Sequence, residues 1–223
     1  MTVKSIVVAM GLLASAGLAA GAQSKSAKSS KAAKPAPAPA NLHFTVAPTG
    51  NEARYRVREQ LAGIDFPTDA VGVTHDITGS LVVEPNGTIF PDSSRIVVNI
   101  QNLKSDKSTR DRYLHTHSIE IDKYPTVMFT PKSFLGLNTK PGTAGSTFGM
   151  TGDLTVHGVT HPVTWQVNAH EDGDDILGTA TTKFTFHDFG MEPPKKAILL
   201  SVMDTVKLEY DFHLVQASAV ANK

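Results

Sequence analysis

Residues 71–83, VGVTHDITGSLVV, place mainly apolar side chains on one alternate phase and small or polar side chains on the other. Successive side chains of an extended strand point to opposite faces, so this alternation predicts a β-strand with one buried face and one solvated face. His75 falls on the apolar phase, together with Val73 and Ile77. We interpret His75 either as a hydrogen-bonded core histidine or as a polar group inside a ligand cavity.

The same alternation recurs along the chain from Leu42 onward, and turn-forming residues separate the segments that carry it. Gly158 and Gly173 belong to two of these turns, and Gly152, inside a strand pattern, predicts a sharp bend or bulge. Further strands are expected at residues 53–61, 96–100, 127–129, 148–156, 163–169, 180–186 and 206–214. About eight strands of this kind predict an all-β antiparallel barrel or sandwich.

One segment, residues 105–118, is charged and lacks the two-residue period. Ser108 and Thr109 are the candidate N-caps of a short helix over residues 110–114. We expect a short helical segment there, lying over the mouth or edge of the barrel and ending before Tyr124.

The beginning of the chain has the features of an export signal. Lys4, an apolar run over residues 6–20 and the small residues Ala20-Gly21-Ala22 predict a cleaved signal peptide over residues 1–22, and therefore a periplasmic protein. The run is shorter than the ~20 residues of a membrane-spanning helix, which disfavours a retained anchor.

Two further segments flank the expected barrel at residues 41–216. Residues 23–40 form a Lys/Ser/Ala/Pro-rich linker, and residues 217–223 form a C-terminal tail. The lysines of the linker suit weak contact with an anionic membrane surface, although spacing and solubility are the simpler roles.

Composition excludes several classes of function. Cysteine is absent from all 223 residues, which excludes disulfides, thiol catalysis and cysteine-ligated metals. Five of the 21 basic side chains lie in the first forty residues, whereas all 21 acidic ones lie later, so the body is mildly acidic and a nucleic-acid surface is disfavoured. The nine histidines lack metal-site spacing, and no nucleophile-elbow or phosphate-loop motif occurs. We expect no cofactor, no metal and no catalytic residue.

The segment 151–163, TGDLTVHGVTHPV, resembles the signature of the YceI-like family of secreted, lipocalin-like barrels, which are described as polyisoprenoid-binding. Three other segments keep the order found in that family: Arg110-Asp111 with Leu114, Tyr124-Pro125 followed by Phe129, and Asp188-Phe189-Gly190-Met191. The resemblance covers residues 42–215. It implies a lipocalin-like antiparallel eight-stranded β-barrel.

The resemblance also implies a noncatalytic protein that binds, transports or stores an isoprenoid lipid, either a polyprenyl compound or an isoprenoid quinone, in an apolar tunnel. Family members often carry phenylalanines where this chain has Val73, His75 and Ile77, and an aromatic run near residues 118–121. The residues expected to line the tunnel share the apolar phase of their strands: Val73, His75, Ile77, Val98, Ile100, Phe129, Phe148, Met150, Leu154, Trp165, Val167, Phe184, Phe186, Leu208, Tyr210 and Phe212.

Two other classes of function remain open at this point. The first is an enzyme that acts on an apolar substrate inside the barrel, with His75 or an interior carboxylate as its acid or base. The second is an interaction module whose barrel is filled by its own side chains and which works through its exterior or its lysine-rich linker.

Overall fold

The computed structural model describes residues 41–137 and 145–217. All of them belong to the second of two compact units, Ala40–Lys223. The expected signal peptide, the linker up to residue 40 and residues 218–223 of the tail lie outside the described residues.

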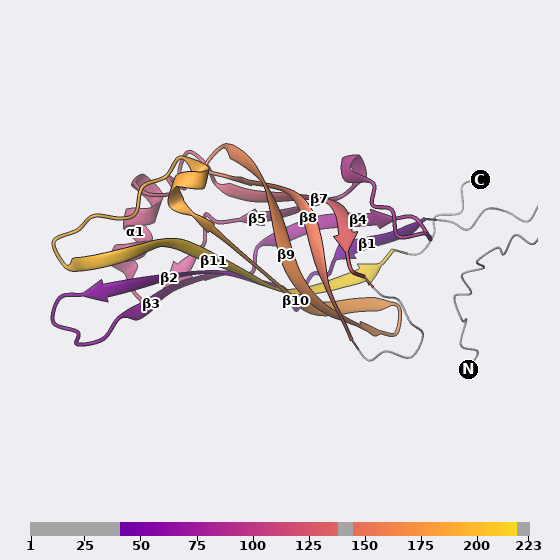
Figure 1. Cartoon of the computed structure of the whole chain (residues 1–223), viewed down its shortest axis with the longest axis horizontal. Coiled ribbons are helices and arrows are strands. Elements are labelled where there is room, and N and C mark those ends of the chain that lie inside the picture. Colours follow the sequence, from indigo (N-terminus) through magenta and orange to yellow (C-terminus); the bar gives the residue numbers. More distant parts are fainter. Residues whose placement is uncertain (1–40, 138–144, 218–223) are drawn as a thin grey trace, which may run out of the picture. The chain divides into compact units, whose positions relative to one another are not determined.

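The described residues form an antiparallel sheet that closes on itself (Figure 1). The barrel expected from the resemblance is confirmed, because β11 pairs with β1 and closes a ring in the order β1-β4-β5-β7-β8-β9-β10-β11. Strands β2, β3 and β6 extend the sheet from β11 beyond that ring. The strands are β1 Leu42–Val46, β2 Glu52–Leu61, β3 Thr68–Thr74, β4 Ile77–Val83, β5 Arg95–Asn99, β6 Lys104–Ser105, β7 Thr126–Leu135, β8 Ser146–Val156, β9 Val159–Asp172, β10 Asp175–Thr185 and β11 Leu199–Gln216.

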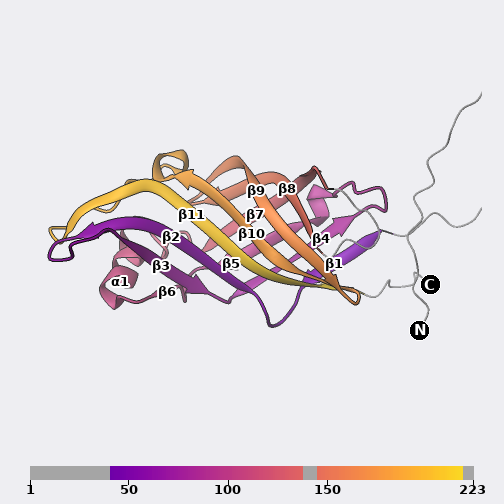
Figure 2. The same ribbon diagram turned by 60° about the horizontal axis from the view of Figure 1, so that its bottom comes forward.

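Strand β11 belongs to both parts of the sheet. Its end, from Leu214 to Gln216, pairs with β1, whereas its earlier residues, from Leu199 to Asp211, pair with β2. The register on the β2 side shifts twice, between Leu199 and Ser201 and between Val202 and Val206. Along its length, β11 therefore changes its neighbour on this side from β2 to β1, as Figure 2 shows.

Residues 71–83 form two strands with a bend between them. The amide of Ile77 donates to the carbonyl of His75 at 3.1 Å across that bend. Thr74 is buried on β3 and Ile77 is buried on β4, three residues apart, so the buried phase shifts by one residue. The expected interior position of His75 is therefore wrong, because its side chain is 69% exposed. Val73 likewise lies on the outer phase of β3 and is half-buried.

The inner phase of β3 is kept small by a neighbouring ring. Gly72 is buried, and a Cβ at that position would lie 2.2 Å from Cε1 of Tyr55 on β2. The Tyr55 ring thus fills the volume that a larger side chain on β3 would need. This close approach explains why a glycine fits at this buried position of β3 and a larger residue does not.

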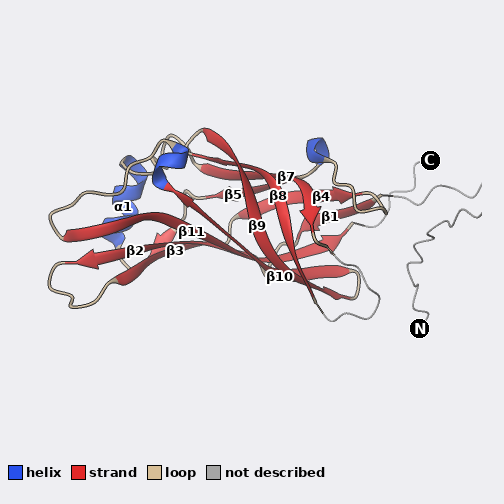
Figure 3. Ribbon diagram, viewed as in Figure 1, coloured by secondary structure: helices blue, strands red, loops and turns tan. Residues whose placement is uncertain are grey.

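The expected short helix is α1, Ser108–Thr116, drawn in blue in Figure 3. It packs beside β6. Its N-cap is Lys107 and not Ser108 or Thr109, and no side chain caps it. The hydroxyl of Ser105 instead accepts from the Lys107 amide at 3.3 Å. Two short 3₁₀ helices, η1 Pro91–Ser93 and η2 Phe186–Phe189, complete the described elements.

The turn between β8 and β9 consists of His157 and Gly158, both with positive φ, at 52° and 75°. Two residues of this conformation make the tight hairpin turn whose twist matches the flanking strands. The expectation that Gly158 reverses the chain is confirmed. Its Cβ, if present, would also lie 2.7 Å from the Tyr124 ring.

An ion-pair ladder ties β2 to β11 on the side of the sheet away from the core. Glu209 accepts from Lys207 Nζ at 2.6 Å and from Arg54 Nε at 3.2 Å, and it lies 3.4 Å from a guanidinium nitrogen of Arg56. Burial on its own would raise the pKa of Glu209. The hydrogen bonds from these three basic side chains outweigh burial and lower that pKa to about 2.

Candidate ligand-binding interior of the barrel

The barrel interior brings most of the expected lining residues together. A single core cluster contains seven of them as buried residues: Phe129, Leu154, Trp165, Val167, Phe184, Phe186 and Phe212. Four more are half-buried and pack against that cluster: Phe148, Met150, Leu208 and Tyr210. The alternation of β8, β9, β10 and β11 therefore predicted the inner face of these strands correctly.

The remaining expected residues lie elsewhere. Ile100 belongs to a second cluster with Leu103, Leu114 and Ile121 near α1, and Val98 packs against that cluster. Ile77 is buried at the beginning of β4. Val73 and His75 lie on the outer phase, as described above. Their position removes His75 as the interior acid or base of the enzymatic alternative.

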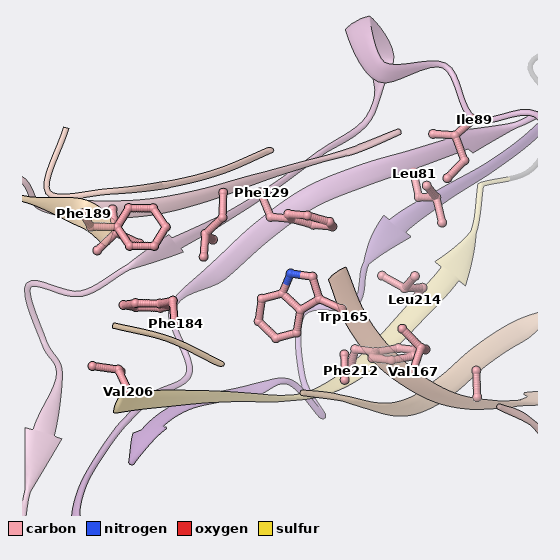
Figure 4. Close-up of a cluster of buried hydrophobic side chains, with 14 of the residues drawn as sticks. Leu81, Ile89, Phe129, Trp165, Val167, Phe184, Phe189, Val206, Phe212 and Leu214 are labelled. Atoms are coloured by element: carbon pink, nitrogen blue, oxygen red, sulfur yellow. The ribbon is translucent and has the colours of Figure 1, made fainter. Parts of the chain in front are cut away.

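Aromatic rings in the interior meet edge to face. The Phe184 and Phe189 centroids lie 4.6 Å apart with their planes at 69°, and those of Phe129 and Trp165 lie 5.8 Å apart at 61°. Figure 4 shows Phe184 and Phe189 at one end of the cluster, Leu214 near the other, and the Trp165 ring between them. Rings in this geometry gain about 0.5 to 1.5 kcal/mol per pair beyond their burial. The surroundings of Trp165 are therefore strongly apolar.

Phe189 is fully buried in this cluster, although strand phase did not indicate it. It lies on η2, after β10 has ended, so the two-residue period no longer applies. Thr185 and Asp188 form a capping box at this short helix, and Gly190 ends it with φ of 64°. In the sequence, the motif Asp188-Phe189-Gly190-Met191 was the available sign that Phe189 is buried, because it places one large apolar residue between capping groups.

Three buried polar atoms have no hydrogen-bond partner among the residues that the structure describes: Trp165 Nε1, the Tyr55 hydroxyl and the Ser118 hydroxyl. Trp165 belongs to the core cluster, whereas Tyr55 packs against both clusters and its hydroxyl is under the influence of the charges of Arg110, Asp111 and Glu59. Burial raises the pKa of Tyr55 to about 12, so its hydroxyl keeps its proton and can donate. An unpaired buried donor costs about 1 to 3 kcal/mol. An acceptor oxygen on a bound molecule would remove that cost.

A charged layer lies where β2 faces α1. Glu59 is on the buried phase of β2, and its carboxylate accepts from an Arg110 guanidinium nitrogen at 2.7 Å. Asp111 accepts from the Ser105 amide at 3.0 Å and from its hydroxyl at 2.6 Å. Burial opposes the charge on Arg110, but hydrogen bonds to Asp106 and Glu59 outweigh it and raise the Arg110 pKa. The Glu59 carboxylate is thus engaged in an ion pair.

The sequence did not reveal Glu59 as an inward-facing residue. The basic residue that pairs with this glutamate is Arg110, 51 positions away, and not the neighbouring Arg58. The motif Arg110-Asp111 was visible, but its partners depend on how α1 meets β2.

Residues 41–137 and 145–217 contain neither a cluster of metal-ligating side chains nor a membrane-spanning helix. No three histidine, aspartate or glutamate side chains converge there in a way that could hold a metal ion. No helix within those ranges is long and apolar enough to cross a membrane.

The chain is similar in sequence to bacterial UPF0312 proteins. The chain is 33% identical over 113 residues to a UPF0312 protein of Pseudomonas putida, covering 47% of this chain and 56% of that one. A UPF0312 protein of Pseudomonas fluorescens is 31% identical over 112 residues, with the same two coverages of 47% and 56%. The matched region therefore spans little more than half the length of these curated relatives.

Solved structures share the fold at low sequence identity. A polyisoprenoid binding domain from Saccharophagus degradans has a TM-score of 0.60 and 14% identity, covering 79% of this chain and 99% of that domain. BcnA of Burkholderia cenocepacia has a TM-score of 0.55 and 15% identity, with coverages of 78% and 99%. The family model of the YceI-like domain matches residues 44–214. Because this match spans the closed ring from β1 to β11, the chain belongs to the YceI-like family.

Proposed function

We propose that this protein binds an isoprenoid lipid inside its barrel and acts as a noncatalytic carrier or store for it. The observation that carries the proposal is an apolar interior that holds an unpaired donor, Trp165 Nε1. Membership of the YceI-like family supports it, as does the polyisoprenoid-binding description of the Saccharophagus degradans domain. An isoprenoid chain is apolar and flexible, and each buried methylene-sized group contributes about 0.8 kcal/mol.

The Trp165 donor favours an isoprenoid quinone over a lipid without oxygen in its head group. A quinone carbonyl accepts hydrogen bonds without bringing a charge into the interior, where an unpaired charge would be costly. Trp165→Phe removes this donor and keeps an aromatic ring. We expect this variant to bind an isoprenoid quinone several-fold more weakly and to bind squalene, a hydrocarbon of the same class, with unchanged affinity.

The test of the main proposal is mass spectrometry of organic extracts from natively purified protein. We expect a copurifying lipid built of isoprene units, and a change in Trp165 fluorescence when an isoprenoid quinone is added to lipid-stripped protein. Absence of both signals would remove the carrier function.

Export to the periplasm is a second part of the proposal and rests on the sequence of residues 1–22. The mature chain should begin at Gln23. The intact mass of the protein recovered from the periplasm of an exporting host measures this, and a full-length species retained in the inner membrane would contradict it.

One observation favours an alternative function. The rings of Phe129, Trp165, Phe184 and Phe189 contact one another in the interior, as expected for a barrel filled by its own side chains. Such a barrel would act as an interaction module through its exterior. A lipid-free extract from a stable, correctly folded protein would favour this function.

A further inference from the structure

The loop between β2 and β3 and the beginning of β11 form a protruding tip that exposes apolar side chains. Six large apolar side chains are exposed in the described part of the chain, and five of them form what we call the apolar tip: Ile64, Phe66, Ile198, Leu200 and Met203. The amide of Ala62 donates to the carbonyl of Ile198 at 2.9 Å, which joins the two segments. Figure 2 shows them side by side at the left of the view.

The strand ladder itself directs these side chains to solvent. The β2–β11 register shifts between Leu199 and Ser201 and again between Val202 and Val206, so Leu200 and Met203 lie at the two irregularities. A bulge leaves a residue unpaired and re-aims its side chain. Leu200 is 66% exposed as a result, and Phe66 on the adjoining loop is 77% exposed. Clustered apolar exposure of this kind marks an interaction surface.

Basic side chains border the apolar tip. Residues 193–203 contain Lys195 and Lys196 and no acidic residue. Lys195 pairs with Glu192 at 3.0 Å, but both side chains are exposed, so the pair is weak and readily exchanged. Lys196 Nζ lies 4.3 Å from the centroid of the Tyr113 ring on α1. Asp65 is the acidic residue of the adjoining loop.

The chemistry of the tip points to a lipid bilayer as its partner. Its exposed apolar surface is on the order of 500 Å², which is large enough to mark an interaction surface. Apolar side chains flanked by lysines suit the headgroup region of an anionic bilayer, where the side chains enter the acyl boundary and the ammonium groups meet phosphates.

We propose that the apolar tip inserts into the surface of an anionic lipid bilayer, with Lys195 and Lys196 at the lipid phosphates. Docking in this way brings the beginning of β11 to the membrane, and later residues of the same strand line the barrel interior. Docking of the tip does not depend on what the barrel interior holds. A protein that does not dock can still carry a lipid, and the reverse, so the two proposals can fail independently.

The experiment is flotation of the full mature protein with two kinds of vesicle. One kind contains equal parts of phosphatidylglycerol and phosphatidylethanolamine, and the other contains phosphatidylcholine alone. We expect Phe66→Ser combined with Leu200→Ser to lower partitioning onto the anionic vesicles at least about tenfold. Leu135→Ser is the matched control, because Leu135 is 49% exposed at the end of β7, outside the tip. It should partition like the unsubstituted protein.

The lysines are tested in the same assay. Lys195→Gln with Lys196→Gln should weaken binding to the anionic vesicles several-fold and leave binding to phosphatidylcholine unchanged. The linker lysines are present in every variant, so differences between variants report on the tip alone. Circular dichroism should show the same melting temperature throughout, since the substituted side chains are exposed.

A second measurement does not rely on removing apolar groups. The chain has no cysteine, so Phe66→Cys and Leu135→Cys can each carry one environment-sensitive dye. The dye at position 66 should shift to the blue on anionic vesicles, and the dye at position 135 should not.

Several results would overturn the docking proposal. These are absence of vesicle binding by the unsubstituted protein, equal binding by the serine double variant, or equal dye shifts at the two positions. Concentration-dependent dimers that the serine variant abolishes, without vesicle binding, would instead assign the tip to a second copy. Mass spectrometry of lipid extracts from the same preparations measures the carrier function independently.

Discussion

The ion pair between Glu59 and Arg110 offers the sharpest test of how α1 is held against the barrel. Their side chains are 8% and 14% exposed, and the closest charged atoms are 2.7 Å apart. Arg110→Met leaves the Glu59 carboxylate buried without its counter-charge, and removal of one partner of such a pair costs about 3 to 5 kcal/mol. We expect that loss in the free energy of unfolding. Glu59→Met should cost less, because Arg110 keeps its ion pair with the exposed Asp106.

The double variant separates the pair from other effects. Methionine fills similar volume at both positions, so replacing both charges should cost only about 1 kcal/mol. The two single losses together then exceed the double loss by at least about 2 to 4 kcal/mol, which is the coupling energy of the pair. Urea unfolding followed by Trp165 fluorescence measures all four proteins. Glu59→Gln is the conservative control, since its amide oxygen still accepts from Arg110. Single-variant losses that simply add in the double variant would refute the buried pair.

Three further predictions address the turn, the interior and the ion-pair ladder. Gly158→Ala should lower the free energy of unfolding by more than Gly173→Ala, because both have positive φ (75° and 67°) but only Gly158 would place its Cβ 2.7 Å from the Tyr124 ring; equal losses in urea unfolding would contradict this contact. Val167→Phe should keep its melting temperature and lose copurified lipid if the interior holds a ligand, whereas a loss of about 1 to 3 kcal/mol with a lipid-free unsubstituted protein would indicate a filled core. Glu209 has a pKa of about 2 in the folded protein and an ordinary pKa of 4.5, so its ion pairs stabilise the fold above pH 4.5, and this stabilisation is lost as the pH falls from 4.5 to about 2. The melting temperature of Glu209→Gln should therefore fall less steeply over this pH range than that of the unsubstituted protein.

The sequence predicted the inner face best where a strand is long and regular. On β9, Trp165 and Val167 are buried and their neighbours are exposed, as the alternation requires. The prediction failed at His75, because the chain bends between β3 and β4 and the two-residue count does not continue through a bend. The sequence pattern does not reveal such a bend when the apolar residues after it fall on the same alternate positions as those before it.

Other parts of the candidate site depend on contacts between distant segments. Glu59 finds its counter-charge in Arg110, which reaches it from α1, and position 72 admits only glycine because the Tyr55 ring occupies the adjoining space. Phe189 enters the interior from a 3₁₀ helix, where strand periodicity does not apply. Each of these placements follows from tertiary packing, which a one-dimensional pattern does not encode.

The way in which β11 closes the ring has a consequence for the order in which the molecule is built. Residues 199–216 form the last described strand, and they alone join β10 to β1, whose residues lie more than 150 positions earlier. Until this strand is in place, β1 and β10 both keep an unpaired edge. The pairing of β11 with β1 forms slowly, because it joins segments that are far apart in the sequence. Without β11 the ring stays open. A chain truncated before residue 199 could never close it, and the unpaired edges of β1 and β10 would be free to pair with other chains.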